Sequence, residues 1–340
     1  MDRPLVTFVV LSYNQERFIR EALRGALAQT YSPLQIIVSD DCSQDETFEI
    51  IQQELAGYDG PHQILLNRND RNLGLAGHYN RVMELARGDL IVSAAGDDVS
   101  LPTRTEELVR LWSDEGAFSV YSNSITMKED GGSMEDTDEL AISAPLGDWR
   151  GLVESGRRPV AGCTHAWDRT VFDTFGPLPE SDIHEDWVIP FRSALLGKIA
   201  HTDKYLVKWR RHGATLSHRY DDLVRVDLAR FAKLQAVTAR RHASDGECWL
   251  RDIRLFLQNH PEMETELSWG ASIIAARVEF YKFKVAALEG NRMERLRGCS
   301  RAIRRVRKLG MKYVTKVGLL GVSPMTYCRM QRRWYEGLAS

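Results

Sequence analysis

The chain has 340 residues, of which 43% are apolar and 27% are charged. This composition is typical of a folded globular protein and excludes a disordered chain or a coiled coil. The length suits one large domain with an extension, or two domains. The net charge of −2 hides an asymmetry, because residues 292–333 carry 13 Lys or Arg and one acid, whereas the remainder carries 32 bases and 46 acids. The basic segment therefore needs its own explanation.

Three features bear on the compartment in which the protein works. No window reaches the roughly 18–20 uninterrupted apolar residues of a membrane-spanning helix. The N-terminus leads from Met1 straight into a strand pattern and lacks the layout of a secretory signal. The five cysteines are scattered, without a Cys-x-x-Cys pair, so a disulfide framework or a zinc cluster is not expected. These features predict a cytoplasmic protein, with a peripheral position on the inner face of the membrane as an alternative.

Strand and helix patterns alternate over residues 5–102. The run Leu5–Leu11 is apolar and rich in β-branched residues, as expected for a strand covered on both faces. Ser43–Glu46 has the pattern of a capping box that opens a helix. The expected strands are 5–11, 34–38, 62–66, 90–92 and 118–122, and the expected helices begin near Phe18, Ser43 and His78. Such alternation predicts an α/β fold with a mainly parallel sheet and helices on both of its faces.

Polar side chains follow three of these strands, at Tyr13, Asp41 and Asp98. Ligands of parallel sheets bind beyond the carboxyl ends of the strands, so these side chains are expected in one site. The pair Asp97–Asp98 comes directly after an apolar run, and paired carboxylates suit a divalent metal that bridges phosphates. The first strand–helix turn, Ser12-Tyr13-Asn14-Gln15, is not Gly-x-Gly-x-x-Gly, and a Walker A sequence is absent. A nicotinamide enzyme is therefore not expected.

Five short stretches stand out in this order: Val10–Asn14; Ala28–Tyr31; Ile37–Asp45; Asn72 and Gly74 with Asn80; and Gly96–Asp98 with Pro102. Together they resemble the family-2 glycosyltransferases, which have the GT-A fold. The resemblance covers roughly residues 4–217. It implies a GT-A catalytic domain at 1–217, with a nucleotide-sugar half at 1–102 and an acceptor half at 103–217. Residues 218–340 would then be a helical extension.

The resemblance implies roles in nucleotide binding for particular residues. Tyr13 should stack on the base, where the alternative is an aromatic that packs against the first helix. Asp41 should accept a base N–H, where the alternative is a helix cap. Asp97 should lie near the ribose. The other positions implied for the nucleotide are Leu11, Ser12, Asn72 and Gly77.

A metal site, for Mn²⁺ or Mg²⁺, is implied at Asp98. Many family members have Asp-x-Asp here, but the position two before Asp97 is Ala95. Metal binding should therefore depend on Asp98 and the diphosphate, and it should be weak without nucleotide. His212, in the stretch 206–217, could complete the metal shell or contact the diphosphate, and its alternative is a solvated histidine. Arg210 or Arg211 could neutralise the diphosphate.

The general base is expected in the segment 181–192. Inverting sugar transfer needs a carboxylate that takes the proton of the acceptor hydroxyl, opposite the leaving group. The resemblance favours Asp186, with Glu185 as second choice and Trp187 near the acceptor, while helix capping is the alternative for both acids. His184 is expected to be a surface residue. The stretches 159–167 and 171–176 should line the acceptor pocket, and 129–139 should be a loop.

The remainder of the chain is expected to be helical, and it carries no catalytic motif. Helices are expected around 223–237, 249–257 and 273–285, and they should support the domain or mediate self-association. Apolar residues at helical spacing between Met293 and Leu320 alternate with bases. Such a helix could lie on anionic lipid or dock on its own domain; nucleic acid is not expected, because no nucleic-acid motif accompanies it.

The sequence as a whole predicts a metal-dependent, inverting glycosyltransferase. The expected donor is a nucleotide-diphosphate sugar, with UDP as the nucleotide, and the expected acceptor is a glycan or lipid-linked glycan. The alternative is a glycan- or nucleotide-binding relative without activity, against which the set Asp41, Asp98 and Asp186 argues. Nucleotidyltransferases share the architecture, but their Gly-rich phosphate loop is missing.

Overall fold

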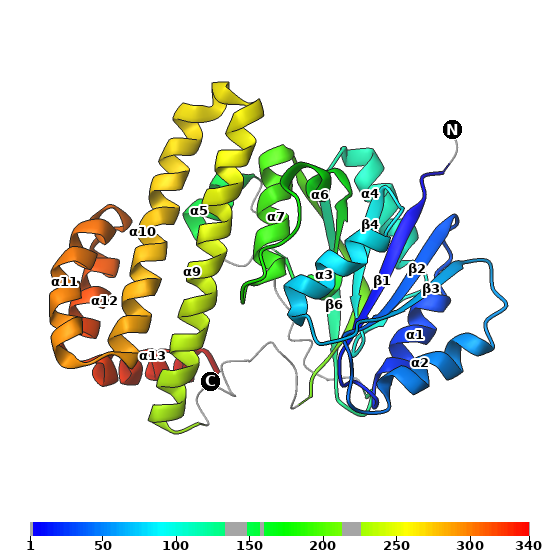
Figure 1. Ribbon diagram of the computed structural model, residues 1–340, viewed down its shortest axis with the longest axis horizontal. Coiled ribbons are helices and arrows are strands. Elements are labelled where there is room, and N and C mark those ends of the chain that lie inside the picture. Colours follow the sequence, from blue (N-terminus) through cyan, green and yellow to red (C-terminus); the bar gives the residue numbers. More distant parts are fainter. Residues whose placement is uncertain (1–2, 133–147, 157–159, 213–225, 340) are drawn as a thin grey trace. The chain divides into compact units, whose positions relative to one another are not determined.

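The computed structural model describes residues 3–132, 148–156, 160–212 and 226–339. The chain forms two compact units (Figure 1). The first contains residues 1–180 and 185–213, and the second contains residues 181–184 and 214–340. The acidic stretch expected to be a loop lies outside the described residues from position 133 onward, as does the end of the 206–217 stretch.

The first unit is built on an eight-stranded sheet with the order β3-β2-β1-β4-β7-β6-β8-β5. Strands β3, β2, β1 and β4 are parallel, whereas β7 is antiparallel to both β4 and β6, and β5 is antiparallel to β8. The strands are β1 Val6–Ser12, β2 Leu34–Asp40, β3 Gln63–Arg68, β4 Leu90–Ala95, β5 Val99–Ser100, β6 Ser119–Met127, β7 His165–Asp168 and β8 Ile199–Arg210. The predicted mainly parallel sheet is confirmed.

Helices cover both faces of this sheet. They are α1 Ile19–Leu27, α2 Thr47–Ala56, α3 Gly74–Leu85, α4 Arg104–Glu115, α5 Trp149–Ser155, α6 Thr170–Phe175 and α7 Glu185–Leu196. Successive side chains of a strand point to opposite faces, so Phe8 of β1 joins a core with Leu23 of α1 and Leu108 of α4. The fully buried strands explain why their sequences are continuous apolar runs.

Two predicted helix starts are wrong. Helix α2 begins at Thr47 without the expected capping box, and its first N–H bonds to the side chain of Asp45 instead. The hydroxyl of Ser43 accepts the N–H of Asn14. Helix α3 begins four residues before the expected His78, at Gly74.

A buried polar network closes the amino-terminal edge of the sheet. The Thr7 hydroxyl donates to Gln35 Oε1 over 2.7 Å and accepts the N–H of Gly88 over 2.9 Å. Gln35 also accepts the N–H of Arg87 and donates to the carbonyl of Leu85. These bonds give hydrogen-bond partners to the backbone groups between the end of α3 and the start of β4. They also require the backbone at Gly88 to pack directly against β1.

Gly88→Ala is expected to destabilise the first unit by about 1–3 kcal/mol, the usual cost of overpacking. An added Cβ would clash with the backbone N of Thr7 and lie 2.6 Å from the carbonyl carbon of Val6. The backbone of β1 cannot move away, because it is hydrogen-bonded to strands on both sides. Thermal unfolding measures the loss. Gly57→Ala is the matched control, because its Cβ would meet nothing within 4 Å. Equal melting temperatures for the two variants would contradict the prediction.

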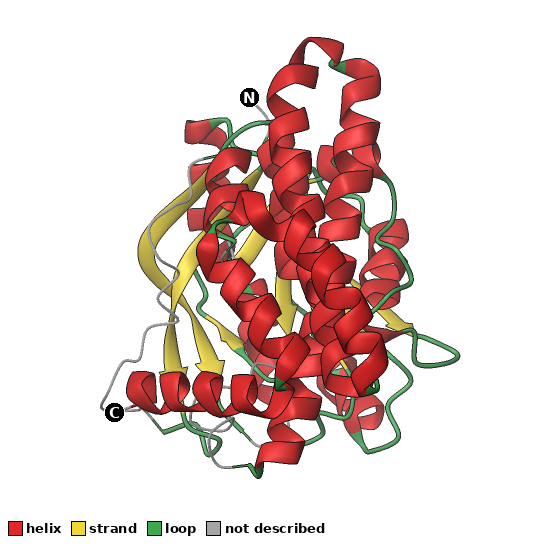
Figure 2. Cartoon of the chain, turned by 90° about the vertical axis from the view of Figure 1, so that its left-hand side faces the viewer, coloured by secondary structure: helices red, strands yellow, loops and turns green. Residues whose placement is uncertain are grey.

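The second unit is helical. Its helices are α9 Leu228–Asn259, α10 Glu264–Glu289, α11 Arg292–Val306, α12 Met311–Val322 and α13 Pro324–Ala339. Helices α9 and α10 form a long antiparallel hairpin (Figure 1 and Figure 2). The helices expected around 223–237 and 249–257 are thus parts of one helix, α9, in the described region. The C-terminal helical region is confirmed.

The basic segment does not form one continuous amphipathic helix. It breaks between α11 and α12, where Gly310 adopts a φ of +93°. Apolar residues of its predicted face, Val306, Val317 and Leu320, are fully buried in the unit's own core beside Phe231. The pattern therefore serves packing within the unit, while its bases stay on the outside. Among the described residues, no helix is both long and apolar enough to cross a bilayer.

Candidate functional site

The carboxyl ends of β1, β2 and β4 are hydrogen-bonded to one another. The N–H of Asp41, just past β2, donates to the carbonyl of Ser12 over 2.9 Å. The N–H of Gly96, just past β4, donates to the carbonyl of Leu11 over 2.8 Å. The segments that carry Tyr13, Asp41 and Asp97 therefore leave the sheet side by side, as their positions in the sequence predicted.

The two loops that follow β1 and β2 are held in strained backbone conformations. Asn14 and Cys42 have φ angles of 50° and 62°, in the left-handed region that non-glycine residues rarely adopt. Asn14 Oδ1 accepts the N–H of Gln44, and buried Asp40 accepts the backbone N–H of Ser43. Such strain persists only where surrounding bonds enforce it, and it is commonly found at binding sites.

Tyr13 presents its ring to solvent. Its exposed fraction is 44%, whereas Phe18, at the start of α1, is 7% exposed. Phe18 is thus the aromatic that packs against the helix, and the packing alternative for Tyr13 is wrong. The neighbouring predicted residues contribute little side-chain surface. Ser12 is buried with its hydroxyl directed to the carbonyl of Ser39, and Leu11 is also buried.

Asp41 caps the start of α3. Its Oδ1 accepts from Asn69 Nδ2 at 2.8 Å and from the N–H of Leu73 at 2.9 Å, and its Oδ2 accepts the N–H of Gly74 at 3.1 Å. Asn72 Oδ1 also accepts the N–H of Gly74. The capping alternative is therefore right, although the helix is α3 rather than α2. A carboxylate has about four acceptor positions, so one position remains for a ligand N–H.

Gly77 lies within α3, not in a loop. Its Cβ would lie 2.9 Å from the Cβ of Leu73, so glycine is needed there for packing of the first helical turn. No role in nucleotide binding follows from this position.

The Asp97–Asp98 turn is held from β8. Asp98 is 5% exposed, and its Oδ1 accepts the backbone N–H of Arg210 over 2.8 Å. Burial, followed by the neighbouring charge of Asp97, raises the pKa of Asp98 well above its ordinary range. The site therefore stores an electrostatic cost that a bound cation would relieve.

Arg210 supports this turn through its buried side chain. Its side chain is 1% exposed. The guanidinium donates to the carbonyls of Asp97 and Glu129 and to Glu21 Oε2, and it lies over the ring of Phe18. These bonds use three of its five N–H groups, and the diphosphate contact expected for Arg210 stays a prediction. Arg211 is half-buried, and its N–H donates to the carbonyl of Met127.

His212 lies on Asp97. Its Nε2 is 3.0 Å from Asp97 Oδ2, its ring centroid is 4.4 Å from that of Phe18, and its side chain is 5% exposed. The solvated alternative is therefore wrong. The structure links this imidazole to the carboxylate predicted for the ribose rather than directly to Asp98.

Cys163 relates the acids of α7 to Asp98. Glu185 and Asp186 form the first turn of α7, and Asp186 is 9% exposed. The Cys163 side chain hydrogen-bonds Asp98, and its chain neighbour Gly162 lies against both α7 acids. Burial raises the pKa of Tyr79 well above its ordinary value, and the charges of Glu185 and Asp186 raise it further.

Sequence reasoning missed Tyr79, and it placed Cys163 only within the expected acceptor stretch 159–167. Nothing in a lone cysteine or in a helical tyrosine indicates a bond to Asp98 or a place near the acids of α7. Gly162, beside Cys163, allows the close approach of α7, because a Cβ there would clash with Glu185 Oε1 and lie 3.7 Å from the Cβ of Asp186. Trp187 is half-buried in the same first turn.

Residues 7–164 match the family model described as "Glycosyl transferase family 2". The match identifies a family-2 glycosyltransferase domain in this part of the chain, which is just under half of its length. Among curated relatives, an uncharacterized protein of Mycobacterium tuberculosis is 26% identical over 227 residues, which cover 63% of this chain and 60% of that protein. The UDP-Glc:α-D-GlcNAc-diphosphoundecaprenol β-1,3-glucosyltransferase WfaP of Escherichia coli is 30% identical over 125 residues, 37% of this chain and 48% of that protein. The chain thus spans less than two thirds of the length of these relatives.

Solved structures show the fold of the chain. TarS of Staphylococcus aureus in complex with UDP-GlcNAc superimposes with a TM-score of 0.54 at 13% identity, covering 98% of this chain and 91% of TarS. The mannosyltransferase PcManGT of Pyrobaculum calidifontis in complex with GDP-Man and Mn²⁺ superimposes with a TM-score of 0.53 at 16% identity, covering 98% of this chain and 88% of PcManGT. The predicted GT-A fold is confirmed.

Proposed function

We propose that this glycosyltransferase moves a sugar from a nucleotide diphosphate to a hydroxyl of a glycan or lipid-linked glycan, with inversion at the anomeric carbon. The observation that carries the proposal is the grouping of acids at one edge of the sheet. The end of β2 brings Asp41, the end of β4 brings Asp97 and Asp98, and α7 brings Asp186 beside Gly162, next to the Cys163 side chain that bonds Asp98.

The nucleotide would bind over the loop after β1. The exposed ring of Tyr13 offers a stacking surface for a base, worth about 1–3 kcal/mol in comparable contacts. The acceptor position left on Asp41 suits the imide N–H of uracil. UDP is therefore the first candidate, and the UDP-GlcNAc bound by TarS supports it. The GDP-Man bound by PcManGT makes GDP the competitor.

A divalent cation fits the carboxylates at the end of β4. Asp98 is buried with a pKa raised by burial and by Asp97, and oxygen donors are the ligands that Mg²⁺ and Mn²⁺ prefer. Asp98 would hold the ion together with the diphosphate, and His212 would orient Asp97. When bound, the ion would neutralise part of the negative charge on the departing diphosphate. The Mn²⁺ of PcManGT supports this assignment.

Asp186 would act as the general base. The acceptor oxygen forms its bond to the anomeric carbon while the bond from that carbon to the phosphate oxygen breaks, and the hydroxyl proton passes to the Asp186 carboxylate. Its place in the first turn of α7 puts the carboxylate at the amino end of a helix, where negative charge interacts favourably with the helix dipole. Glu185, packed against Gly162, is the second choice.

The bases of the second unit would contact an anionic surface that carries the acceptor. Arg304, Arg305, Arg307 and Lys308 line a hollow of about 430 Å³ with Glu279. Each base near an anionic lipid surface contributes about 1 kcal/mol. The lipid-linked acceptor named for the E. coli relative supports this part of the proposal.

A thermal-shift screen of nucleotides and nucleotide sugars tests the donor assignment. UDP with Mn²⁺ is expected to raise the melting temperature more than either alone. At a hundredfold excess over Kd, a bound ligand adds about 2.7 kcal/mol to the free energy of unfolding. Tyr13→Ala should reduce this shift, whereas Tyr205→Ala, which removes a tyrosine of similar exposure on β8, should not. A response to no nucleotide diphosphate at all would overturn the proposal in favour of a non-catalytic binding protein.

A further inference from the structure

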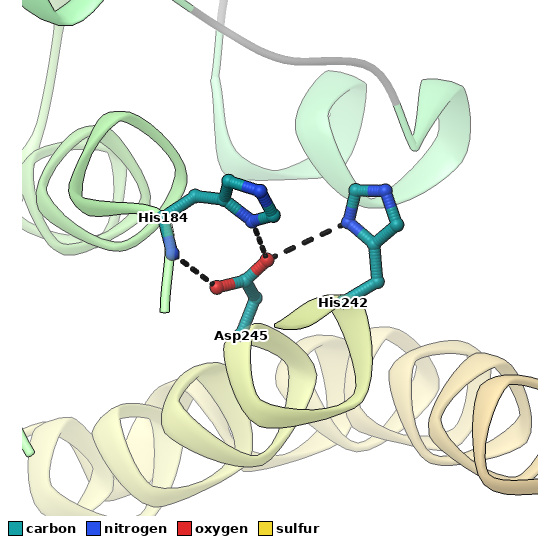
Figure 3. Close-up of side chains that lie close together, drawn as sticks. All are labelled: His184, His242 and Asp245. Atoms are coloured by element: carbon teal, nitrogen blue, oxygen red, sulfur yellow. Dashed lines mark hydrogen bonds and ion pairs between the residues drawn. The ribbon is translucent and has the colours of Figure 1, made fainter. Parts of the chain in front are cut away.

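The second unit contains two imidazoles and a carboxylate that sugar transfer does not use. His184 comes from the segment 181–184, and His242 and Asp245 lie one turn apart on α9 (Figure 3). One possible ligand atom from each residue lies within 4.8 Å of the other two. His184 is therefore not the surface residue that the sequence predicted, since its side chain is 26% exposed and bonded to a buried acid.

Both imidazoles are directed to the same carboxylate oxygen. His184 Nδ1 is 2.7 Å from Asp245 Oδ2, and His242 Nδ1 is 3.5 Å from it (Figure 3). The His184 backbone N–H donates to Asp245 Oδ1 over 2.8 Å. The Asp245 side chain is only 2% exposed. The arrangement brings two nitrogen ligands and one oxygen ligand to a common point, as a metal centre requires.

The positions of these side chains are fixed by the fold. Residues three apart on a helix share one face, which places His242 beside Asp245. A second contact, between Asp182 and Arg241 over 2.7 Å, ties the segment 181–184 to the same helix. The ligand set is therefore pre-formed, and little conformational entropy would be lost when an ion binds.

A metal would take the place of the protons now shared within the cluster. The Nδ1 atoms of His184 and His242 both face Asp245 Oδ2, so an ion at that point would meet both nitrogens and the carboxylate oxygen. Neutral imidazole and carboxylate are the forms that bind metals, and metal binding releases protons from the ligands.

We propose that His184, His242 and Asp245 bind a divalent transition metal, with Zn²⁺ as the first candidate. Two imidazoles and one carboxylate form a common protein ligand set for zinc, whereas Mg²⁺ prefers oxygen ligands alone. The site is separate from the ion proposed at Asp98 and needs no cysteine, which is why the cysteine pattern did not indicate it. The metal would join residue 184 to α9 and so fix the chain directly before Glu185.

Metal content of the full chain tests the proposal. The protein is stripped with a chelator, exposed to Zn²⁺, dialysed and analysed by mass spectrometry for bound zinc. We expect one equivalent in the wild type and a loss of affinity of at least about 100-fold in His242→Ala, because removal of even an indirect partner of a metal ligand costs 10–100-fold. His260→Ala, which removes another histidine at the end of α9, and Asp98→Asn should both retain the zinc.

A second variant guards against a loss that results from misfolding. His242→Cys offers a thiolate, so its Co²⁺ form should show a near-ultraviolet sulfur-to-cobalt charge-transfer band that the wild type lacks. Absence of stoichiometric zinc in the wild type would overturn the proposal, as would full retention in His242→Ala or a His242→Cys protein without that band. The readout does not involve sugar transfer, so the proposed function and this site can fail independently.

Discussion

Asp98→Asn is expected to abolish the joint stabilisation by UDP and Mn²⁺ and, at the same time, to raise the melting temperature of the ligand-free protein. The second effect follows from burial. The Asp98 carboxylate is 5% exposed and lies beside Asp97, so its charge costs free energy that a neutral amide does not. Asn keeps an oxygen that can accept the Arg210 N–H. We expect a gain of about 0.5–2 kcal/mol, or about 2–6 °C.

The pH dependence of this gain gives a sharper test. The folded-state pKa of Asp98 is raised above its ordinary value of 3.8. A carboxyl group whose pKa is raised by folding contributes its full stability below the unfolded-state pKa. This contribution is lost as the pH rises through the folded-state pKa. The difference in melting temperature between Asp98→Asn and wild type should therefore be small near pH 4 and should grow toward neutral pH.

An exposed acid provides the control for this variant. Asp59→Asn changes a carboxylate on an exposed turn and should alter neither the melting temperature nor the response to UDP with Mn²⁺. An Asp98→Asn protein that melts below the wild type at pH 7 and still responds to UDP with Mn²⁺ would remove Asp98 from the proposed metal site.

The strand ends could be predicted from the sequence because they depend on local patterns. A buried parallel strand is a continuous apolar run, and the first polar residue after it marks the edge where ligands bind. Tyr13 and Asp98 were found in this way. The exposed ring of Tyr13 and the buried carboxylate of Asp98 follow from the geometry of that edge.

The partners of these residues could not be predicted, because they come from distant parts of the chain. Asp41 caps a helix that begins 33 residues later, and the Arg210 N–H reaches back to Asp98 across 112 residues. An arginine next to a histidine suggests phosphate binding in a sequence. Only the packing of α1 and β8 shows that the guanidinium of Arg210 is buried against Glu21.

The basic segment shows the same limit in another form. An amphipathic helix has one hydrophobic pattern whether its apolar face meets lipid or protein. Val306 and Leu320 are buried in the unit's own core, which no periodicity distinguishes from a membrane-facing stripe. The His184 cluster was missed for a similar reason, since a single histidine followed by Glu185 does not indicate a partner such as Asp245, 61 residues away.

Asp186→Asn is expected to lower kcat for sugar transfer by about 10²–10⁴, the usual contribution of a general base. The thermal response to UDP with Mn²⁺ should stay unchanged, because the carboxylate is proposed to act on the acceptor hydroxyl and not on the nucleotide. The variant is nearly isosteric, so Asp186, which is 9% exposed, can be replaced without opening a cavity. Steady-state kinetics with the donor from the screen measure the effect.

Glu185→Gln is the matched control, since it removes the adjacent charge from the same first turn of α7. Both variants lose a favourable interaction with the helix dipole of about 0.3–1 kcal/mol, so any shared loss of stability cancels in the comparison. A large decrease in kcat for Asp186→Asn alone identifies the base. If instead Glu185→Gln is the inactive variant and Asp186→Asn transfers sugar at the wild-type rate, the base is Glu185, and the proton must leave on the side of α7 that packs against Gly162.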